Sequence, residues 1–318
     1  MGTGDAANCS RRWLVIAALL LIVALTPMAA HAQASECNER CLKSILHLYL
    51  ALLPTHDPSK LPLGSDLEAR ENSEPVRLGE GSWQSITAVL PGYEYADPET
   101  GNVVYGGGVR RGRALGILFL RLKILDGHII ESEMLTSGPG AILAPGSQPP
   151  GAALQTSPLR APDLSGLMFP DILYAAPVPS SRRSTRTQLA RVPFQYMEGL
   201  TRADGSIPPF GLRCDRWDVD GRKLTNNPVN PNGAVTCATA LDAMKRLQGR
   251  RIVNRRVVAV DVPLGIAVGM FIISYDIDGL QATRNVAEIF KVVDGRIRSI
   301  EEFNVPGRTP PGSGFTGQ

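Results

Sequence analysis

The segment VVDGRIRSIEEFNV at 292–305 decides the fold, because its pattern occurs a second time at 124–137 as ILDGHIIESEMLTS. Each segment runs from apolar residues through Asp-Gly into a stretch in which apolar residues alternate with polar or acidic ones. Asp-Gly between two such runs is typical of a tight turn in an antiparallel hairpin. Aligning the two turns gives an offset of 168 residues (294 − 126).

A second pair of matching segments lies upstream in the same order. YADPETGNVVYG at 95–106 corresponds to AVDVPLGIAVGM at 259–270, with an offset of 164 residues (261 − 97). Two matches at nearly equal offsets indicate an internal duplication. In each copy, helix-compatible sequence precedes strand-compatible sequence. We therefore predict an α+β fold of two tandem domains, each with helices packed on a curved antiparallel sheet.

The N-terminus is typical of an export signal. Two arginines precede the apolar run WLVIAALLLIVAL and small residues follow it, which predicts a signal peptide over 1–32 that is cut after Ala32. The run is short for a spanning helix, although an uncleaved anchor is the alternative. We expect a periplasmic or secreted protein with no stable membrane insertion after cleavage.

Composition divides the rest of the chain. We predict domain 1 over 33–137, a Pro- and Gly-rich linker over 138–185, domain 2 over 186–305 and a disordered tail over 306–318. The linker contains an apolar segment, LSGLMFPDILYAA at 164–176 (the apolar island), which is expected to dock on one of the domains. The formal net charge of +3 is small for 318 residues, so we expect no nucleic acid partner.

Four cysteines remain after removal of the signal. In an oxidising compartment an even number indicates two disulfides, for which four cysteines allow three connectivities. We expect Cys214 to pair with Cys237, and Cys37 with Cys41, whose spacing brings two α-carbons near bridging distance at a helix start. A zinc site is the alternative, but it lacks paired C-x-x-C spacing and a nearby histidine. We predict no metal and no cofactor.

Four short segments carry a resemblance to a known family. These are REN at 70–72, GEGSW at 79–83 and the Asp-x-x-x-Gly hairpins that begin at Asp97 and Asp261. With the bent-sheet pattern, they resemble a secreted, tandem-repeat branch of the nuclear transport factor 2-like or SnoaL-like superfamily. The resemblance implies that the two tandem domains are cone-shaped, each an α+β cone with a strongly curved antiparallel sheet. It does not imply one chemistry, because the superfamily includes isomerases, dehydratases, cyclases, epoxide hydrolases and binding proteins.

Side chains alternate along a strand, so one charged position marks the face of a whole row. We take Lys123 and Lys291 as marking the solvent side of two long strands. The predicted inner rows are Leu118, Leu120, Leu122 and Ile124 in the first copy and Val286, Glu288, Phe290 and Val292 in the second. Glu288 is thus a carboxylate among apolar neighbours, where a raised pKa creates a general acid or base.

The returning strand of each hairpin is predicted to place further glutamates inside. With Arg298 on the outer side, Glu301 faces inward, and Glu131 and Glu133 occupy the corresponding strand of the first copy. Acidic groups among apolar side chains fit acid–base sites. The alternative is structural ion pairing near the sheet rim. The arginines available for it are Arg121, Arg113 and Arg284.

Tyr49 lies in the middle of the apolar arc of the predicted first helix. Its hydroxyl either donates a hydrogen bond inside the cone, as a first-helix tyrosine does in ketosteroid isomerase-like proteins that this fold resembles, or is a satisfied core hydroxyl. Tyr196 occupies the same place in the second copy, where Pro193 interrupts the helix just before it.

Two further groups are candidates for substrate binding. Arg70 and Glu71 follow the first helix, and Arg216 and Asp218 lie at the loosely equivalent place in the second copy. Such arginine–carboxylate pairs either hold a substrate carbonyl or carboxylate, or pin the loop. Trp83 either provides a flat apolar wall for a ligand or packs in the core.

These residues favour an exported, cofactor-free lyase, dehydratase or isomerase that uses carboxylate acid–base chemistry. Its expected substrate is a small, largely apolar molecule of aromatic, terpenoid or steroid-like type. The alternative is a binding protein for a hydrophobic small molecule, without chemistry. Chains could also pair through their sheets as homodimers.

Overall fold

The computed structural model describes residues 37–138, 141, 171–218, 224–226, 235–246, 248–277 and 280–308. The predicted signal peptide and its cleavage site lie outside the described residues, as do most of the predicted linker and tail. Within the described ranges, no helix is both long enough and apolar enough to cross a membrane.

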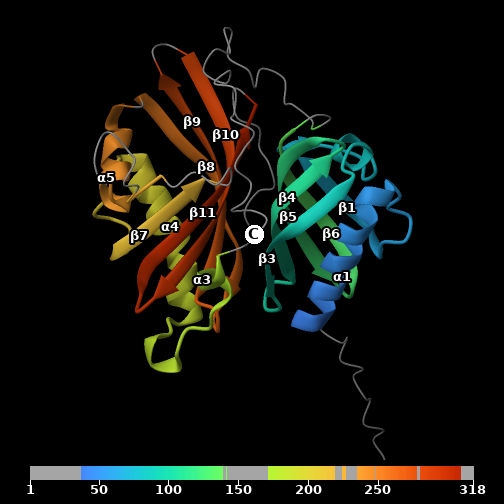
Figure 1. The fold of residues 1–318 in the computed structure, drawn as a ribbon, viewed down its shortest axis with the longest axis horizontal. Coiled ribbons are helices and arrows are strands. Elements are labelled where there is room, and N and C mark those ends of the chain that lie inside the picture. Colours follow the sequence, from blue (N-terminus) through green and yellow to red (C-terminus); the bar gives the residue numbers. More distant parts are fainter. Residues whose placement is uncertain are drawn as a thin grey trace, which may run out of the picture. The chain divides into compact units, whose positions relative to one another are not determined.

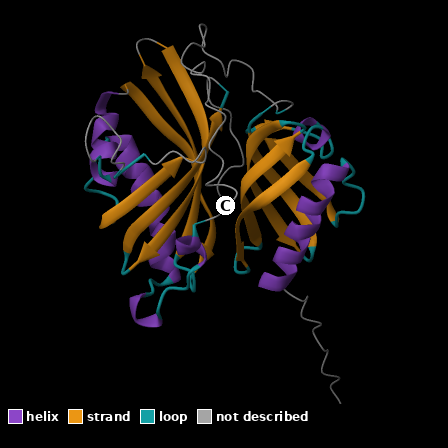
Figure 2. Ribbon diagram, in the orientation of Figure 1, coloured by secondary structure: helices purple, strands orange, loops and turns teal. Residues whose placement is uncertain are grey.

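The first half of the chain packs one long helix on one face of a six-stranded sheet (Figures 1 and 2). The helical elements are α1 (Glu39–Leu52) and the 3-10 turns η1 (Leu53–Thr55) and η2 (Gly81–Gln84). The strands are β1 (Leu63–Glu71), β2 (Glu74–Pro75), β3 (Ala88–Asp97), β4 (Asn102–Arg111), β5 (Ala114–Leu125) and β6 (His128–Thr136). Their order in the sheet is β2-β1-β6-β5-β4-β3.

The second half repeats this arrangement with five strands. Its helical elements are α3 (Ile172–Ala175), η3 (Ser180–Arg182), α4 (Arg186–Arg202), α5 (Cys237–Asp242) and η4 (Ala243–Arg246). The strands are β7 (Phe210–Asp218), β8 (Gln248–Asp261), β9 (Ile266–Ile277), β10 (Leu280–Val293) and β11 (Arg296–Pro306). The order β7-β11-β10-β9-β8 matches β1-β6-β5-β4-β3 strand for strand, which confirms the predicted α+β class.

Both sheets are mixed, because the first strand of each half pairs in parallel with the last. β1 runs parallel to β6, and β7 runs parallel to β11. The remaining pairs are antiparallel, with the two Asp-Gly turns joining β5 to β6 and β10 to β11. All four turn residues have positive φ, between 49° and 76°, as a type I′ hairpin turn requires.

Local sequence signals begin the two long helices. Asn38 caps α1 by accepting a hydrogen bond from the backbone N–H of Cys41, and Thr185 with Gln188 forms a capping box at the start of α4. Both expected disulfides are present. Cys37 bonds to Cys41 at the start of α1, and Cys214 on β7 bonds to Cys237 on α5.

Each half has its own core between its helices and its sheet. In the first half α1 packs on the row Leu118, Leu120, Leu122 and Ile124, and in the second α4 packs on Val286, Phe290 and Val292. The predicted inner rows of β5 and β10 are therefore confirmed. α4 also packs closely on β9, where a Cβ on Gly269 would lie 2.8 Å from Cβ of Pro193.

A third core lies between the two sheets, on the faces away from the helices. Phe119 and Leu135 of the first half and Ile289 and Phe303 of the second belong to it, and the Phe119 and Phe303 ring centroids are 5.5 Å apart. Tyr174 of α3 is also in this core, so the described end of the apolar island docks as expected. One face of each sheet is thus covered within a single chain.

This third core overturns one assumption made from the sequence. Lys291 was taken as marking the solvent side of its strand, but only 1% of the residue is exposed. Its Nζ donates hydrogen bonds to the carbonyl oxygens of Ala176 and Leu264, each at 2.6 Å. The face is buried because the opposite sheet and Tyr174 of α3 pack against it. Lys123, its counterpart in the first half, is half-buried.

A β-bulge after each Asp-Gly turn changes the sheet face to which the side chains of the returning strand point. The register of β5 and β6 shifts between Lys123 and Ile124, and that of β10 and β11 between Lys291 and Val292. Because side chains alternate with a period of two, one extra residue moves every later side chain to the other face. The predicted inward orientation is therefore wrong for Glu131, Glu133 and Glu301.

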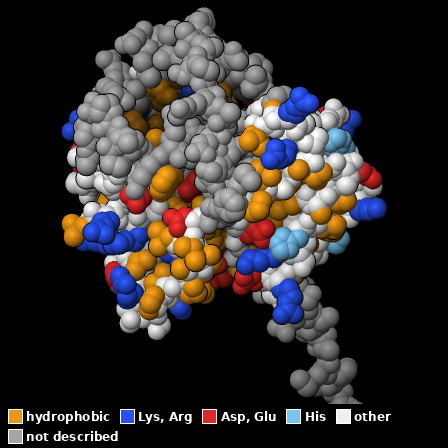
Figure 3. Space-filling model, viewed as in Figure 1, with side chains coloured by type: hydrophobic (Ala, Val, Ile, Leu, Met, Phe, Trp, Pro, Cys, Tyr) orange, Lys and Arg blue, Asp and Glu red, His pale blue; other side chains and the backbone are white. Residues whose placement is uncertain are grey.

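The described surface in Figure 3 carries basic and acidic side chains that are interspersed, in keeping with the small net charge.

The close approach of the two sheets predicts a severe effect of a small substitution. A Cβ on Gly106 of β4 would lie 2.7 Å from Cζ of Phe303. We expect Gly106→Ala to overpack the third core and to lower the free energy of unfolding by about 2 kcal/mol. Urea titration measures this loss. Gly64→Ala is the control, because the added carbon would meet the Ile130 side chain at 3.1 Å, and equal losses for both variants would contradict the prediction.

Candidate functional site

A cavity of about 240 Å³ lies on the helix side of the second sheet. Its apolar lining consists of Leu200, Leu224, Met244, Phe271, Ile273 and Val286. Its polar lining consists of Arg216, Tyr275, Arg284, Glu288, Glu302 and Asn304. The polar residues come mainly from β7, β10 and β11, and the apolar Val286 lies between Arg284 and Glu288 on β10.

Glu288 is the most unusual group in this cavity. The residue is fully buried, and neither carboxylate oxygen has a hydrogen bond that meets normal geometry among the described residues. Burial raises the pKa of Glu288 to about 7, although the Arg216 charge and the neighbouring Tyr196 hydroxyl partly offset it. Near neutral pH both the protonated and the ionised form are therefore populated, as a general acid or base requires.

Arg216 and Glu302 lie beside Glu288. Arg216, from β7, forms an ion pair with Glu302 of β11, and its Nη2 is 3.8 Å from Oε1 of Glu288. Glu302 and Glu288 are directly opposite each other on neighbouring strands. One guanidinium therefore serves two carboxylates and lies closer to Glu302. Alternation alone missed Glu302, because the bulge in β11 brings it to the cavity side.

Tyr196 supplies a neutral hydroxyl close to Glu288. It projects from α4, is fully buried, and packs edge-on against Phe290 with ring centroids 5.2 Å apart. Burial raises the pKa of Tyr196 far above its ordinary value, so the hydroxyl keeps its proton. The structure thus brings together three predicted residues from three elements. The fourth candidate, Asp218, has a side chain that lies outside the described residues.

The equivalent region of the first half is filled by its own side chains. The position of Glu288 is taken by Leu120 (288 − 168). The Tyr49 hydroxyl is 2.9 Å from the Ser132 hydroxyl and accepts a hydrogen bond from Nε1 of Trp83 at 3.1 Å. All three residues are buried, and burial raises the pKa of Tyr49 to about 12. Tyr49 and Trp83 therefore match the core alternative and not the ligand-facing one.

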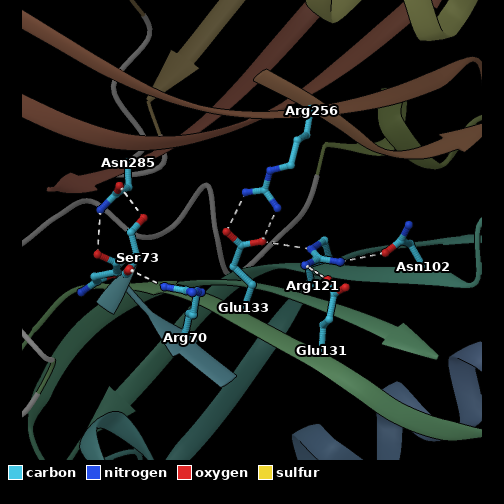
Figure 4. Close-up of polar contacts among 9 residues, drawn as sticks. Arg70, Ser73, Asn102, Arg121, Glu131, Glu133, Arg256 and Asn285 are labelled. Carbon is cyan, nitrogen blue, oxygen red and sulfur yellow. Dashed lines mark hydrogen bonds and ion pairs between the residues drawn. The ribbon is translucent and has the colours of Figure 1, made fainter. Parts of the chain in front are cut away.

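The REN segment at 70–72 holds the loop around Ser82 in place and supports a contact between the two halves. Glu71 accepts hydrogen bonds from the backbone N–H and the hydroxyl of Ser82, at 2.8 and 2.7 Å. Arg70 donates to the carbonyl of Ser73 at 3.4 Å, and the Ser73 hydroxyl donates to Asn285 of β10 at 2.7 Å (Figure 4). Of the two predicted roles for Arg70 and Glu71, these contacts match pinning.

Glu131 and Glu133 belong to an ion cluster between the sheets. Glu133 receives two hydrogen bonds from Arg256 of β8, at 2.7 and 2.8 Å, and one from Arg121 at 3.0 Å (Figure 4). Arg121 also pairs with Glu131 at 2.5 Å. Burial would raise the pKa of Glu133, but the two guanidinium groups outweigh it and hold the pKa below its ordinary value. This is the ion-pair alternative, and Arg256 is a partner that the sequence did not indicate.

Glu301 lies on the same face, near three buried tyrosines. Burial raises the pKa of Tyr93, Tyr95 and Tyr174, and the charge of Glu301 raises each further. Glu301 therefore lies outside the cavity in which it was expected.

One family model matches the half of the chain that holds the cavity. This model, described as "Domain of unknown function (DUF8021)", matches residues 182–304. No curated protein matches the chain. Among solved structures, the chain is similar to an NTF2-like protein of unknown function from Cytophaga hutchinsonii, with 16% identity and a TM-score of 0.27. That similarity covers 38% of this chain and 100% of the other.

The ion cluster predicts a large cost for losing one carboxylate. Glu133→Gln leaves Arg121 and Arg256 close together and short of one negative charge in a buried interface, so we expect the free energy of unfolding to fall by about 3 kcal/mol. Glu131→Gln is the matched control, since Glu131 is less buried and pairs with Arg121. We expect it to cost about 1 kcal/mol in the same urea titration. A smaller loss for Glu133→Gln than for Glu131→Gln would contradict this account.

The raised pKa of Glu288 predicts how stability depends on pH. Between about pH 4.5 and pH 7 the folded protein keeps a proton that the unfolded chain releases, so this group lowers stability as pH rises through that window. Glu288→Leu removes the effect, and at pH 8 we expect it to raise the free energy of unfolding by about 3 kcal/mol.

Urea titrations at pH 4.5 and pH 8 measure the difference. The control is Glu80→Gln, which removes an exposed carboxylate and should shift both values equally. The same gain at both pH values for Glu288→Leu would show that Glu288 does not titrate in this range.

Proposed function

We propose that the second half binds a small, largely apolar molecule in its cavity and transfers a proton with Glu288. The observation that carries this proposal is a fully buried carboxylate at the cavity with no normal hydrogen bond among described residues. Burying such a group lowers the stability of the fold, and an apolar side chain in its place would raise it. Its presence is therefore explained better by a function than by stability. Catalytic sites commonly retain groups of this kind.

The surrounding groups suggest how the reaction would run. Glu288 in its ionised form would take a proton from a carbon next to a carbonyl, while Tyr196 and Arg216 stabilise the negative charge that develops on the carbonyl oxygen. The protonated Glu288 would then return this proton, either to another carbon, which gives an isomer, or to a β-hydroxyl that leaves as water when the enolate collapses. This chemistry fits a cofactor-free lyase, dehydratase or isomerase.

The size of the cavity limits the substrate. At about 240 Å³ it is below the range of about 300–1,000 Å³ that ligand pockets usually occupy. A single aromatic ring or a small terpenoid fits this volume better than a steroid. We further propose that the protein is exported, since its two disulfides suit an oxidising compartment.

Deuterium uptake from heavy water tests the proposed proton transfer. Small aromatic and cyclic ketones are incubated with the protein, and mass spectrometry measures exchange at the carbon next to the carbonyl. We expect Glu288→Gln to reduce the rate by roughly 100-fold or more. The rate with the unmodified protein should rise with pH and level off above about pH 7, because the ionised carboxylate is the base.

The control variant is again Glu80→Gln, which should retain the full rate. If the unmodified protein binds these ketones but exchanges them no faster than Glu288→Gln does, the proton-transfer proposal fails. Binding without chemistry would then be the better account of the cavity.

A further inference from the structure

Arg284 is a charged group of the cavity that the proposed proton transfer does not use. It lies on β10 in the same helix-side row as Val286 and Glu288, and it lines the cavity while remaining half-buried. Among the described carboxylates, none lies within ion-pair distance of Arg284. The other arginine of the cavity, Arg216, is paired with Glu302.

The charges of the described residues that line the cavity do not balance. The described lining contains two guanidinium groups, from Arg216 and Arg284, and the carboxylates of Glu302 and Glu288. When Glu288 carries its proton, one positive charge has no counter-charge among these groups. A guanidinium in this situation favours an anionic ligand, and its planar pair of N–H donors fits a carboxylate especially well.

The position of Arg284 also sets the length of the ligand. Four residues along one strand separate the Cα atoms of Arg284 and Glu288 by about 13 Å, and the Arg284 side chain shortens the span to be bridged. Between them lie Val286 and, directly opposite it on β9, Phe271. Both are apolar and both line the cavity, so the middle of the ligand would contact apolar side chains.

We propose that the ligand is a small monocarboxylic acid with an apolar body, whose carboxylate binds Arg284 while its reactive carbon lies at Glu288. Val286 and Phe271 contact the apolar body. This inference rests on the proposed function for the location of the reactive carbon, but the binding of the carboxylate at Arg284 is tested separately.

Titration calorimetry at pH 6 with two matched probes tests the inference. The probes are 4-phenylbutanoate and 4-phenylbutanamide, which share an apolar body and differ in charge. We expect the acid to bind roughly tenfold more tightly than the amide, equivalent to about 1.4 kcal/mol. Arg284→Gln should remove this preference and leave binding of the amide unchanged. Arg296→Gln, which removes an exposed charge at the start of β11, should retain it.

Glu288→Gln separates this inference from the proposed function. If the acid preference persists in Glu288→Gln and is lost in Arg284→Gln, the carboxylate site is supported whether or not deuterium exchange occurs. If acid and amide bind the unmodified protein equally, the inference is overturned, while proton transfer by Glu288 can still be established by exchange. Failure of both probes to bind at millimolar concentration would also overturn it.

Discussion

One extra residue after each Asp-Gly turn determines what the two halves can do. The bulge shifts the register of the returning strand, so that acidic side chains which simple alternation would send into the cones lie between the sheets instead. There Glu133 meets Arg256 of the other half. The same shift brings Glu302 to the cavity, opposite Glu288. The contact between the halves and the composition of the cavity thus share one backbone cause.

The sequence predicts best what depends on short-range signals. The duplication, the two Asp-Gly hairpin turns and the inner rows of β5 and β10 were predictable because Asp-Gly and strand alternation act over a few residues. The inward orientation of Glu288 was predicted for the same reason, since Glu288 lies on the strand that precedes the bulge. Glu133 was misplaced because a bulge leaves no mark in an alternating pattern. Arg256, 123 residues from Glu133, and the burial of Lys291 both depend on contact between distant segments, which no local pattern reports.

The two halves meet different demands on the same architecture. In the first half, Leu120 and the bonded group of Tyr49, Ser132 and Trp83 fill the space under the helix and satisfy its polar atoms. In the second half, the corresponding space contains a cavity and a carboxylate that burial disfavours. The shared core couples the two halves, because unfolding either would expose the sheet face of the other.

The shared core also has an evolutionary consequence. A newly duplicated domain is ordinarily a module that can be lost or transferred to another gene. Here Phe119 and Leu135 of one copy are covered by Ile289 and Phe303 of the other, and neither sheet face would tolerate water alone. Loss of either copy would leave the other with an exposed apolar sheet face that promotes aggregation. The chain is therefore committed to keeping both copies, and sequence drift can change the chemistry of one only within the limits set by its neighbour.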